Sequence, residues 1–175
     1  MEALQIYHHL NPEKKDTSFQ LKRMEAVYDQ HKGAPAEPHR HNYYNVLLVK
    51  EGRATHHLDF HEYAVQDQQV LFVSPGQVHQ LVEHDRSSGY IISFTRDFLI
   101  QNGINECFIS DINLFRDYEE SPPLNLDGDI LARLQNYVQL MESYLDKDYQ
   151  FKFEAISAYL KLFLIVCNGA CEPLF

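Results

Sequence analysis

The sequence has a marked shortage of basic residues. Its 175 residues include 15 lysines and arginines against 25 aspartates and glutamates, which gives a formal net charge of −10. Proteins that bind the phosphate backbone of a nucleic acid carry an excess of lysine and arginine instead. We therefore expect no nucleic-acid binding by this chain alone, and any DNA contact has to come from a local patch or from a further part of the protein.

Cysteine is also scarce, and long apolar runs are missing. The three cysteines, Cys107, Cys167 and Cys171, are odd in number and form no Cys-x-x-Cys pair, which favours reduced thiols. The first residues show neither a basic nor an apolar signal region. The longest apolar run, 160–167, contains Lys161 and is far shorter than the ~20 residues that cross a membrane. These features predict a cytoplasmic protein without a membrane span.

Several catalytic motifs are absent as well. The sequence contains no Gly-x-x-x-x-Gly-Lys phosphate loop, no Gly-x-Ser-x-Gly elbow and no His-Glu-x-x-His helix. No serine or cysteine lies in a recognisable activating context. Nucleophilic catalysis therefore has little support.

Short strand candidates dominate the region before residue 95. An alternating segment runs from Phe19 to Tyr28, with an irregularity near Arg23 and Met24. Further candidates, each bounded by turn residues, lie at 43–50, 53–60, 62–65, 69–73, 79–83 and 90–94. Many short strands without intervening helices are typical of an antiparallel β-sandwich or barrel.

The hydrophobic period changes to that of a helix near the carboxy terminus. Thr95 can cap a short helix over 96–101, and longer helices are predicted at about 127–145 and 151–168, with Gly169 ending the second. The pair forms an antiparallel helical hairpin. Because the second helix is apolar on more than one face, we expect it to be covered by the barrel and by a second subunit. The predicted dimerisation residues are Leu134, Tyr137, Met141, Leu145, Leu160 and Phe163.

These patterns divide the chain into three parts. Residues 1–18 form a polar amino-terminal arm, residues 19–95 form the barrel, and residues 96–175 form the helical segment. A chain of this length is typical of one domain with its own core.

The central stretch from Pro38 to His79 carries the most chemistry. His39 and His41 share one face of a strand, and His79 follows the Pro75-Gly76 turn. Three neutral imidazoles can hold Zn, Fe, Ni or Mn with positions left open for a ligand. The expected carboxylate is replaced by Asn45. In a straight strand His41 and Asn45 lie about 13 Å apart, so both reach one centre only if the chain turns a corner.

The remaining histidines carry no such pattern. His8, His9, His31, His56, His57, His61 and His84 are scattered along the sequence. We interpret them as surface or packing residues. For His39, His41 and His79, hydrogen bonding inside a barrel remains an alternative to metal binding.

Two segments of this stretch resemble known motifs. Residues 38–52, PHRHNYYNVLLVKEG, are similar to the first cupin motif, with Asn45 where metal-binding cupins carry glutamate. Residues 70–79, VLFVSPGQVH, are similar to the second, with Ser74 in place of its first proline. The continuation 90–99, YIISFTRDFL, followed by a helical hairpin, resembles the amino-terminal sensor domain of AraC-type transcriptional regulators.

The resemblance implies a cupin-like antiparallel β-barrel, or jelly roll, followed by a carboxy-terminal helical hairpin, so a mainly β fold with α. It implies a non-enzymatic domain that binds a small polar metabolite, such as a sugar, in the barrel and forms a homodimer through its helices. In that family DNA is bound by a carboxy-terminal pair of helix-turn-helix units, which this chain lacks. The expected ligand-binding residues are His39, His41, Tyr43, Asn45, Leu47, Val73, His79, Tyr90 and Phe94.

Two other functions remain open at this point. The first is a metal-dependent cupin enzyme, an isomerase or dioxygenase, that uses His39, His41 and His79. The missing carboxylate and the helical tail count against it, so we expect no cofactor. The second is a barrel without a ligand that serves only as a dimerisation platform.

Overall fold

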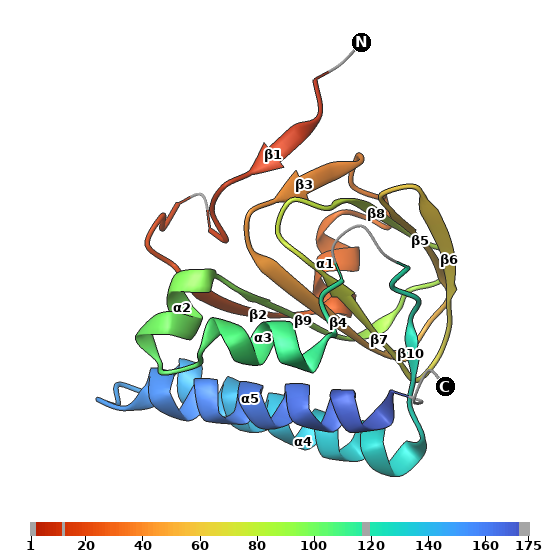
Figure 1. The fold of residues 1–175 in the computed structure, drawn as a ribbon. Helices are drawn as coiled ribbons and strands as arrows, with labels where there is room; N and C mark the ends of the chain where they lie inside the picture. The colour runs from red at the N-terminus through yellow and green to blue at the C-terminus, as the bar shows by residue number, and fades with distance from the viewer. Residues whose placement is uncertain (1–2, 12, 117–119, 172–175) are drawn as a thin grey trace.

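Two five-stranded sheets face each other and form the barrel (Figure 1). The computed structural model describes residues 3–11, 13–116 and 120–171, so the predicted arm and helical segment each extend past the described residues. Sheet A has the strand order β1-β3-β8-β5-β6, and sheet B has the order β10-β7-β4-β9-β2. The fold is the jelly-roll arrangement expected from the sequence, with a layer of helices on one side.

The strands of sheet A are β1 (Gln5–Tyr7), β3 (His39–His41), β8 (Val78–Glu83), β5 (Ala54–Leu58) and β6 (His61–Val65). Those of sheet B are β10 (Leu124–Asn125), β7 (Gln69–Val73), β4 (Tyr44–Glu51), β9 (Ser88–Phe94) and β2 (Phe19–Arg23). Among the described residues, every strand pairing is antiparallel except that of β1 with β3. Six of these strands lie where the alternating pattern between residues 43 and 94 predicts them.

The segment after Arg23 differs from the prediction. The expected strand over 19–28 ends at Arg23, and α1 (Met24–Gln30) follows directly. Met24, Val27 and Tyr28 have helical i, i+3, i+4 spacing, and all three line one cavity. The alternation in the sequence was therefore too short to separate a strand from a one-sided helix.

The remaining helices are α2 (Arg96–Gln101), α3 (Glu106–Ile112), α4 (Gly128–Leu145) and α5 (Lys152–Ala170). As expected, the Thr95 side chain caps α2 by accepting a hydrogen bond from the Phe98 amide. Asp127 caps α4 in the same way through the Ile130 amide. Gly169 lies inside the last turn of α5 rather than beyond it. The predicted helical hairpin is present.

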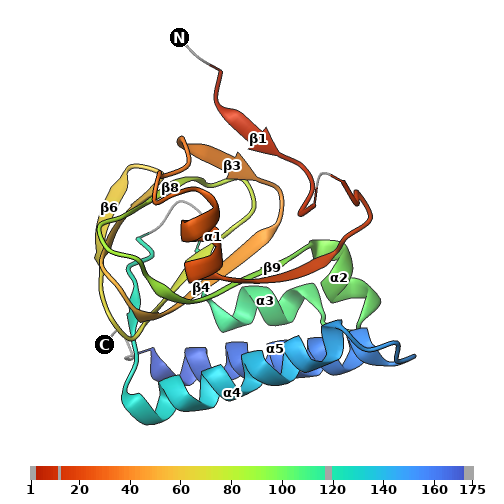
Figure 2. The same ribbon diagram turned by 180° about the vertical axis from the view of Figure 1, so that it is seen from behind.

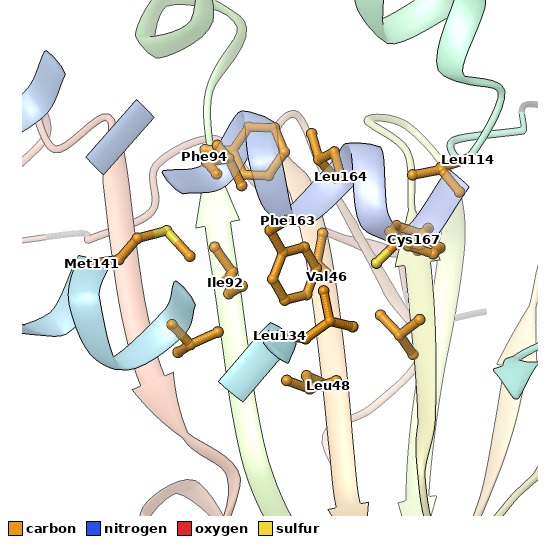
Figure 3. Close-up of a cluster of buried hydrophobic side chains, with 14 of the residues drawn as sticks. Val46, Leu48, Ile92, Phe94, Leu114, Leu134, Met141, Phe163, Leu164 and Cys167 are labelled. Atoms are coloured by element: carbon orange, nitrogen blue, oxygen red, sulfur yellow. The ribbon is translucent and has the colours of Figure 1, made fainter. Parts of the chain in front are cut away.

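Side-chain alternation in sheet B separates two apolar cores. Val46, Leu48 and Ile92 point to the helical layer, where they pack with Leu134 and Phe163 (Figure 3). Residues at the intervening positions point into the barrel and form a second cluster with sheet A, made of Met24, Leu47, Val49, Ala54, Leu58, Val65, Leu71 and Val73. The sheet therefore acts as a wall with the helices on one side and the barrel interior on the other.

Four of the six predicted dimerisation residues belong to the first of these cores. Leu134, Met141, Leu160 and Phe163 have no exposed surface. Assigning them to a subunit interface was wrong, because the apolar stripe of the hairpin covers sheet B of the same chain. Tyr137 and Leu145 are only partly buried. Leu162 and Ile165 of α5 are exposed apolar residues, with 43% and 46% of their surface accessible.

Helix α5 is also long and apolar enough to cross a membrane by length and composition. In this fold, however, Ile156, Leu160, Phe163, Leu164 and Cys167 are buried by the rest of the chain. A helix that packs in a protein core has the same composition, and the buried face of α5 packs in the core of this chain.

Candidate functional site

A cavity of about 410 Å³ lies inside the barrel between the two sheets. Helix α1 lies across the barrel opening in the view of Figure 2 and supplies part of the wall. Six of the nine predicted ligand-binding residues line the cavity: His39, His41, Tyr43, Asn45, Leu47 and His79. A volume of this size is within the usual range for small-molecule pockets.

Strand pairing and a sharp corner bring the polar residues together. His39 on β3 is paired with His79 on β8, which places their side chains next to each other. The chain then passes from β3 in sheet A to β4 in sheet B across Asn42 and Tyr43. As a result, Asn45 Nδ2 lies only 3.0 Å from His41 Nε2. The corner that the sequence required is present.

The imidazoles form a hydrogen-bonded chain whose proton positions can be assigned. His41 Nδ1 lies 3.3 Å from the Tyr43 carbonyl, which can only accept, so Nδ1 carries the proton. Nε2 of the neutral His41 ring is then an acceptor for the Asn45 amide at 3.0 Å and for His79 Nε2 at 2.9 Å. Asn45 Oδ1 in turn accepts from the Ser93 hydroxyl. The inner polar groups therefore satisfy one another.

His56 extends this chain and was missed in the sequence. It is 1% exposed, and its Nε2 lies 3.3 Å from His79 Nδ1. With His79 Nε2 donating to His41, His79 Nδ1 accepts from His56. The signal was present in β5, where His56 alternates with the buried Ala54 and Leu58. The neighbouring His57 points outward, as expected for the other face of the strand.

Burial keeps these rings neutral. It lowers the pKa of His41 to about 4, with a smaller contribution from His39. It also lowers the pKa of His56 to about 4 and that of His79 well below its usual value. Burial raises the pKa of the Tyr43 phenol to about 12. The Tyr43 ring stacks on His41 at 4.3 Å between centroids. The site is a neutral cluster of donors and acceptors at neutral pH.

The three predicted metal ligands do converge. Ligand atoms of His39, His41 and His79 lie within 4.8 Å of one another. His39 Nδ1 donates to the Glu37 carbonyl at 2.7 Å and His41 Nδ1 donates to that of Tyr43, so both rings turn Nε2 to the cluster. These donors fit a divalent transition metal. Among the residues that the structure describes, no carboxylate joins the group, and His79 Nε2 donates a hydrogen bond to His41 Nε2.

Three predicted ligand-binding residues lie elsewhere. Tyr90 and Phe94 belong to the core beneath the helices, because their positions on β9 face away from the barrel. Val73 is inside the barrel, but it packs in the apolar cluster and does not line the cavity. The inward residues of β9 are Ile91 and Ser93, which pair with Leu47 and Asn45. The prediction chose the wrong face of β9. A buried strand carries apolar residues on both faces, so its sequence does not show which face points into the barrel.

The amino-terminal arm reaches the same site. β1 pairs in parallel with β3, and Tyr7 packs edge-on against His39 at 5.0 Å between ring centroids. Tyr7, His9 and Leu10 all line the cavity. The arm therefore contributes part of the cavity wall.

A jelly-roll barrel with a polar cavity and a helical layer on one sheet defines a cupin-type ligand-binding domain. The family model of the AraC-like ligand binding domain matches residues 24–161. The chain belongs to this family of transcription-regulator domains. No curated protein sequence gave a match.

Solved structures share the fold. The AraC-like transcriptional activator CuxR is 18% identical and matches with a TM-score of 0.51, over 75% of this chain and 44% of that one. An apo form of a ToxT variant from Vibrio cholerae is 12% identical, also with a TM-score of 0.51, over 88% of this chain and 54% of that one. This chain thus spans about half the length of these proteins.

Proposed function

We propose that this chain is the effector-binding and dimerisation domain of an AraC-type transcriptional regulator. The observation that carries the proposal is the cavity of about 410 Å³, lined by a neutral imidazole cluster, Tyr43 and Asn45. Fixed donors and acceptors beside apolar walls suit recognition of a small molecule. The proposed role is non-enzymatic and cytoplasmic. DNA would be bound by helix-turn-helix units outside this chain.

Ligand binding can act on the rest of a regulator through two elements. The arm supplies Tyr7 and Leu10 to the cavity wall, and α1 supplies Met24 and Val27. Arg23, directly before α1, forms an ion pair with Glu142 of α4 at 2.9 Å. A ligand that favours one position of α1 or the arm would therefore bias the helical layer, which we propose carries the homodimer contact.

A metabolite screen by thermal shift tests effector binding, because a ligand bound only by the native state raises its stability. For a hit, we expect Tyr43→Ala to weaken binding in calorimetry by about tenfold or more, since a buried aromatic wall is lost. Tyr149→Ala, at an exposed position outside the cavity, serves as the matched control. If the two variants bound the ligand with equal affinity, Tyr43 would not be a ligand-binding residue.

The convergent histidines support a second candidate, the metal-dependent cupin enzyme. His39, His41 and His79 would hold the ion, which would supply Lewis-acid chemistry at a coordinated ligand. We expect elemental analysis of protein purified without chelators to give far less than one Fe, Mn, Ni or Zn per chain. The reason is that the ligand set is neutral and that His79 Nε2 already bonds to His41.

A gain-of-ligand variant makes this prediction sharper. Asn45 Nδ2 lies 3.0 Å from His41 Nε2, so Asn45→Glu places an anionic ligand beside the histidines, and we expect it to raise the metal content towards one ion per chain. Adding His79→Gln to that variant is expected to abolish the gain. Near-stoichiometric metal in the unmodified protein would instead favour the enzyme.

A further inference from the structure

The cavity has a second polar end, far from the histidine cluster. His79, Leu81 and Glu83 lie at alternate positions of β8, and all three line the cavity. Four residues of extended chain separate the α-carbons of His79 and Glu83 by about 13 Å. The wall between them is apolar and includes Leu47, Leu81 and Ile91.

Glu83 is an incompletely satisfied carboxylate. Its Oε1 is buried and has no hydrogen-bond partner among the described residues. Burial raises the pKa of Glu83, and hydrogen bonds from Ser87 only partly oppose the shift. A buried carboxylate oxygen without a partner is costly, and a cationic donor would compensate it.

Among the described residues, no cation pairs with Glu83. Lys22 also lines the cavity, but it is exposed and makes no ion pair with Glu83 among the described residues. The other ionisable groups on the cavity wall are histidines and tyrosines. Glu83 is therefore the anionic group available to a ligand inside the barrel.

We propose that Glu83 is a specificity-determining residue that selects an effector bearing an amine. The amine lies at Glu83, an apolar body of aromatic or aliphatic carbon contacts Leu47, Leu81 and Ile91, and a hydroxyl or other polar group reaches the histidine cluster. This inference rests on the proposed function of the cavity. It replaces the sugar expected from family resemblance, because a polyol would leave the apolar middle of the cavity without a matching surface.

Three small molecules that share one body separate the alternatives. Tyramine, 4-propylphenol and 3-(4-hydroxyphenyl)propionate all carry a phenol and a two-carbon linker, and they end in an amine, a methyl group and a carboxylate. Each is the first member of a set of compounds of similar size: one set of amines, one of neutral compounds and one of carboxylates. Binding of all three sets is measured by thermal shift and then by calorimetry. We expect the hits to be amines that bind about tenfold more tightly than their neutral counterparts, as for one charge-assisted hydrogen bond.

Two variants test whether Glu83 causes the preference for amines. Glu83→Gln keeps the shape of the side chain and removes its charge, so we expect it to abolish the tenfold preference and to leave binding of the neutral compounds unchanged. Glu51→Gln, at an exposed position outside the cavity, changes the net charge equally and is expected to keep the preference.

The other outcomes overturn the inference in distinguishable ways. Hits restricted to neutral compounds or carboxylates, or an amine preference that persists in Glu83→Gln, would refute the role of Glu83 and leave the effector cavity in place. No hit in any of the three sets would contradict both the amine assignment and the proposed effector function.

Discussion

Replacement of Phe163 by alanine is expected to lower the free energy of unfolding by about 3–5 kcal/mol. Phe163 is fully buried between α5 and the outer face of sheet B, beside Leu134 and Ile92. Truncation removes its burial and leaves a cavity that the β-sheet and α4 can close only in part. Urea unfolding followed by circular dichroism measures the loss.

The adjacent residue provides the control for this experiment. Leu162 is 43% exposed on α5, so Leu162→Ala is expected to change the free energy of unfolding by less than about 0.5 kcal/mol. The measurement is repeated at a low and a high protein concentration. If Phe163 belonged to a subunit interface rather than to the chain's own core, the loss in Phe163→Ala would depend on concentration. We expect that loss to be independent of concentration.

The second large effect is a loss of stability in acid. His41 and His56 have pKa values of about 4 in the folded chain, against the usual 6.5. Between these values the unfolded chain binds more protons than the folded chain, so stability falls as pH decreases from 6.5 to 4. Each such histidine contributes a slope of about 1.4 kcal/mol per pH unit. Stability is expected to be constant with respect to these groups above pH 7.

Neighbouring histidines on β5 test the origin of this slope. His56→Gln removes a buried ring that has to stay neutral, so we expect a shallower dependence of the unfolding free energy on pH than in the unmodified protein. His57→Gln alters a ring that is partly exposed beside Glu62 and is expected to keep the full slope. Urea unfolding at several pH values between 4 and 7 compares the variants. Identical slopes in the two variants would place the acid sensitivity outside the histidine chain.

Much of the fold was predictable because it depends on local patterns. Turn residues and alternation located six strands between residues 43 and 94, and helical spacing located α4 and α5. The start of α1 was not predictable in this way. Met24, Ala26 and Tyr28 alternate as in a strand, but the segment is a helix in which Met24, Val27 and Tyr28 line the cavity of the barrel.

The candidate site was predictable where side-chain spacing alone decides it. His39 and His41 share a strand face, and the Pro75-Gly76 turn returns His79 to them. The role of His56 depends on pairing between β5 and β8, which brings it to His79, 23 positions further along the chain, and no local pattern encodes that pairing. The error on Tyr90 and Phe94 has the same origin, because only the packing of the helices shows which face of β9 is the inner one.

The sequence by itself determined the positions of six strands along the chain, the helical hairpin and the convergence of His39, His41 and His79. Those features follow from residue periodicity and turn chemistry, which act over a few residues. Only the tertiary structure decided what surrounds each group. It made the imidazoles a neutral hydrogen-bonded chain, assigned the apolar stripe of the hairpin to the chain's own core, and left the carboxylate of Glu83 at the far end of the cavity. Burial and the identity of neighbouring groups are set by contacts between distant segments, and these contacts exist only once the barrel has closed.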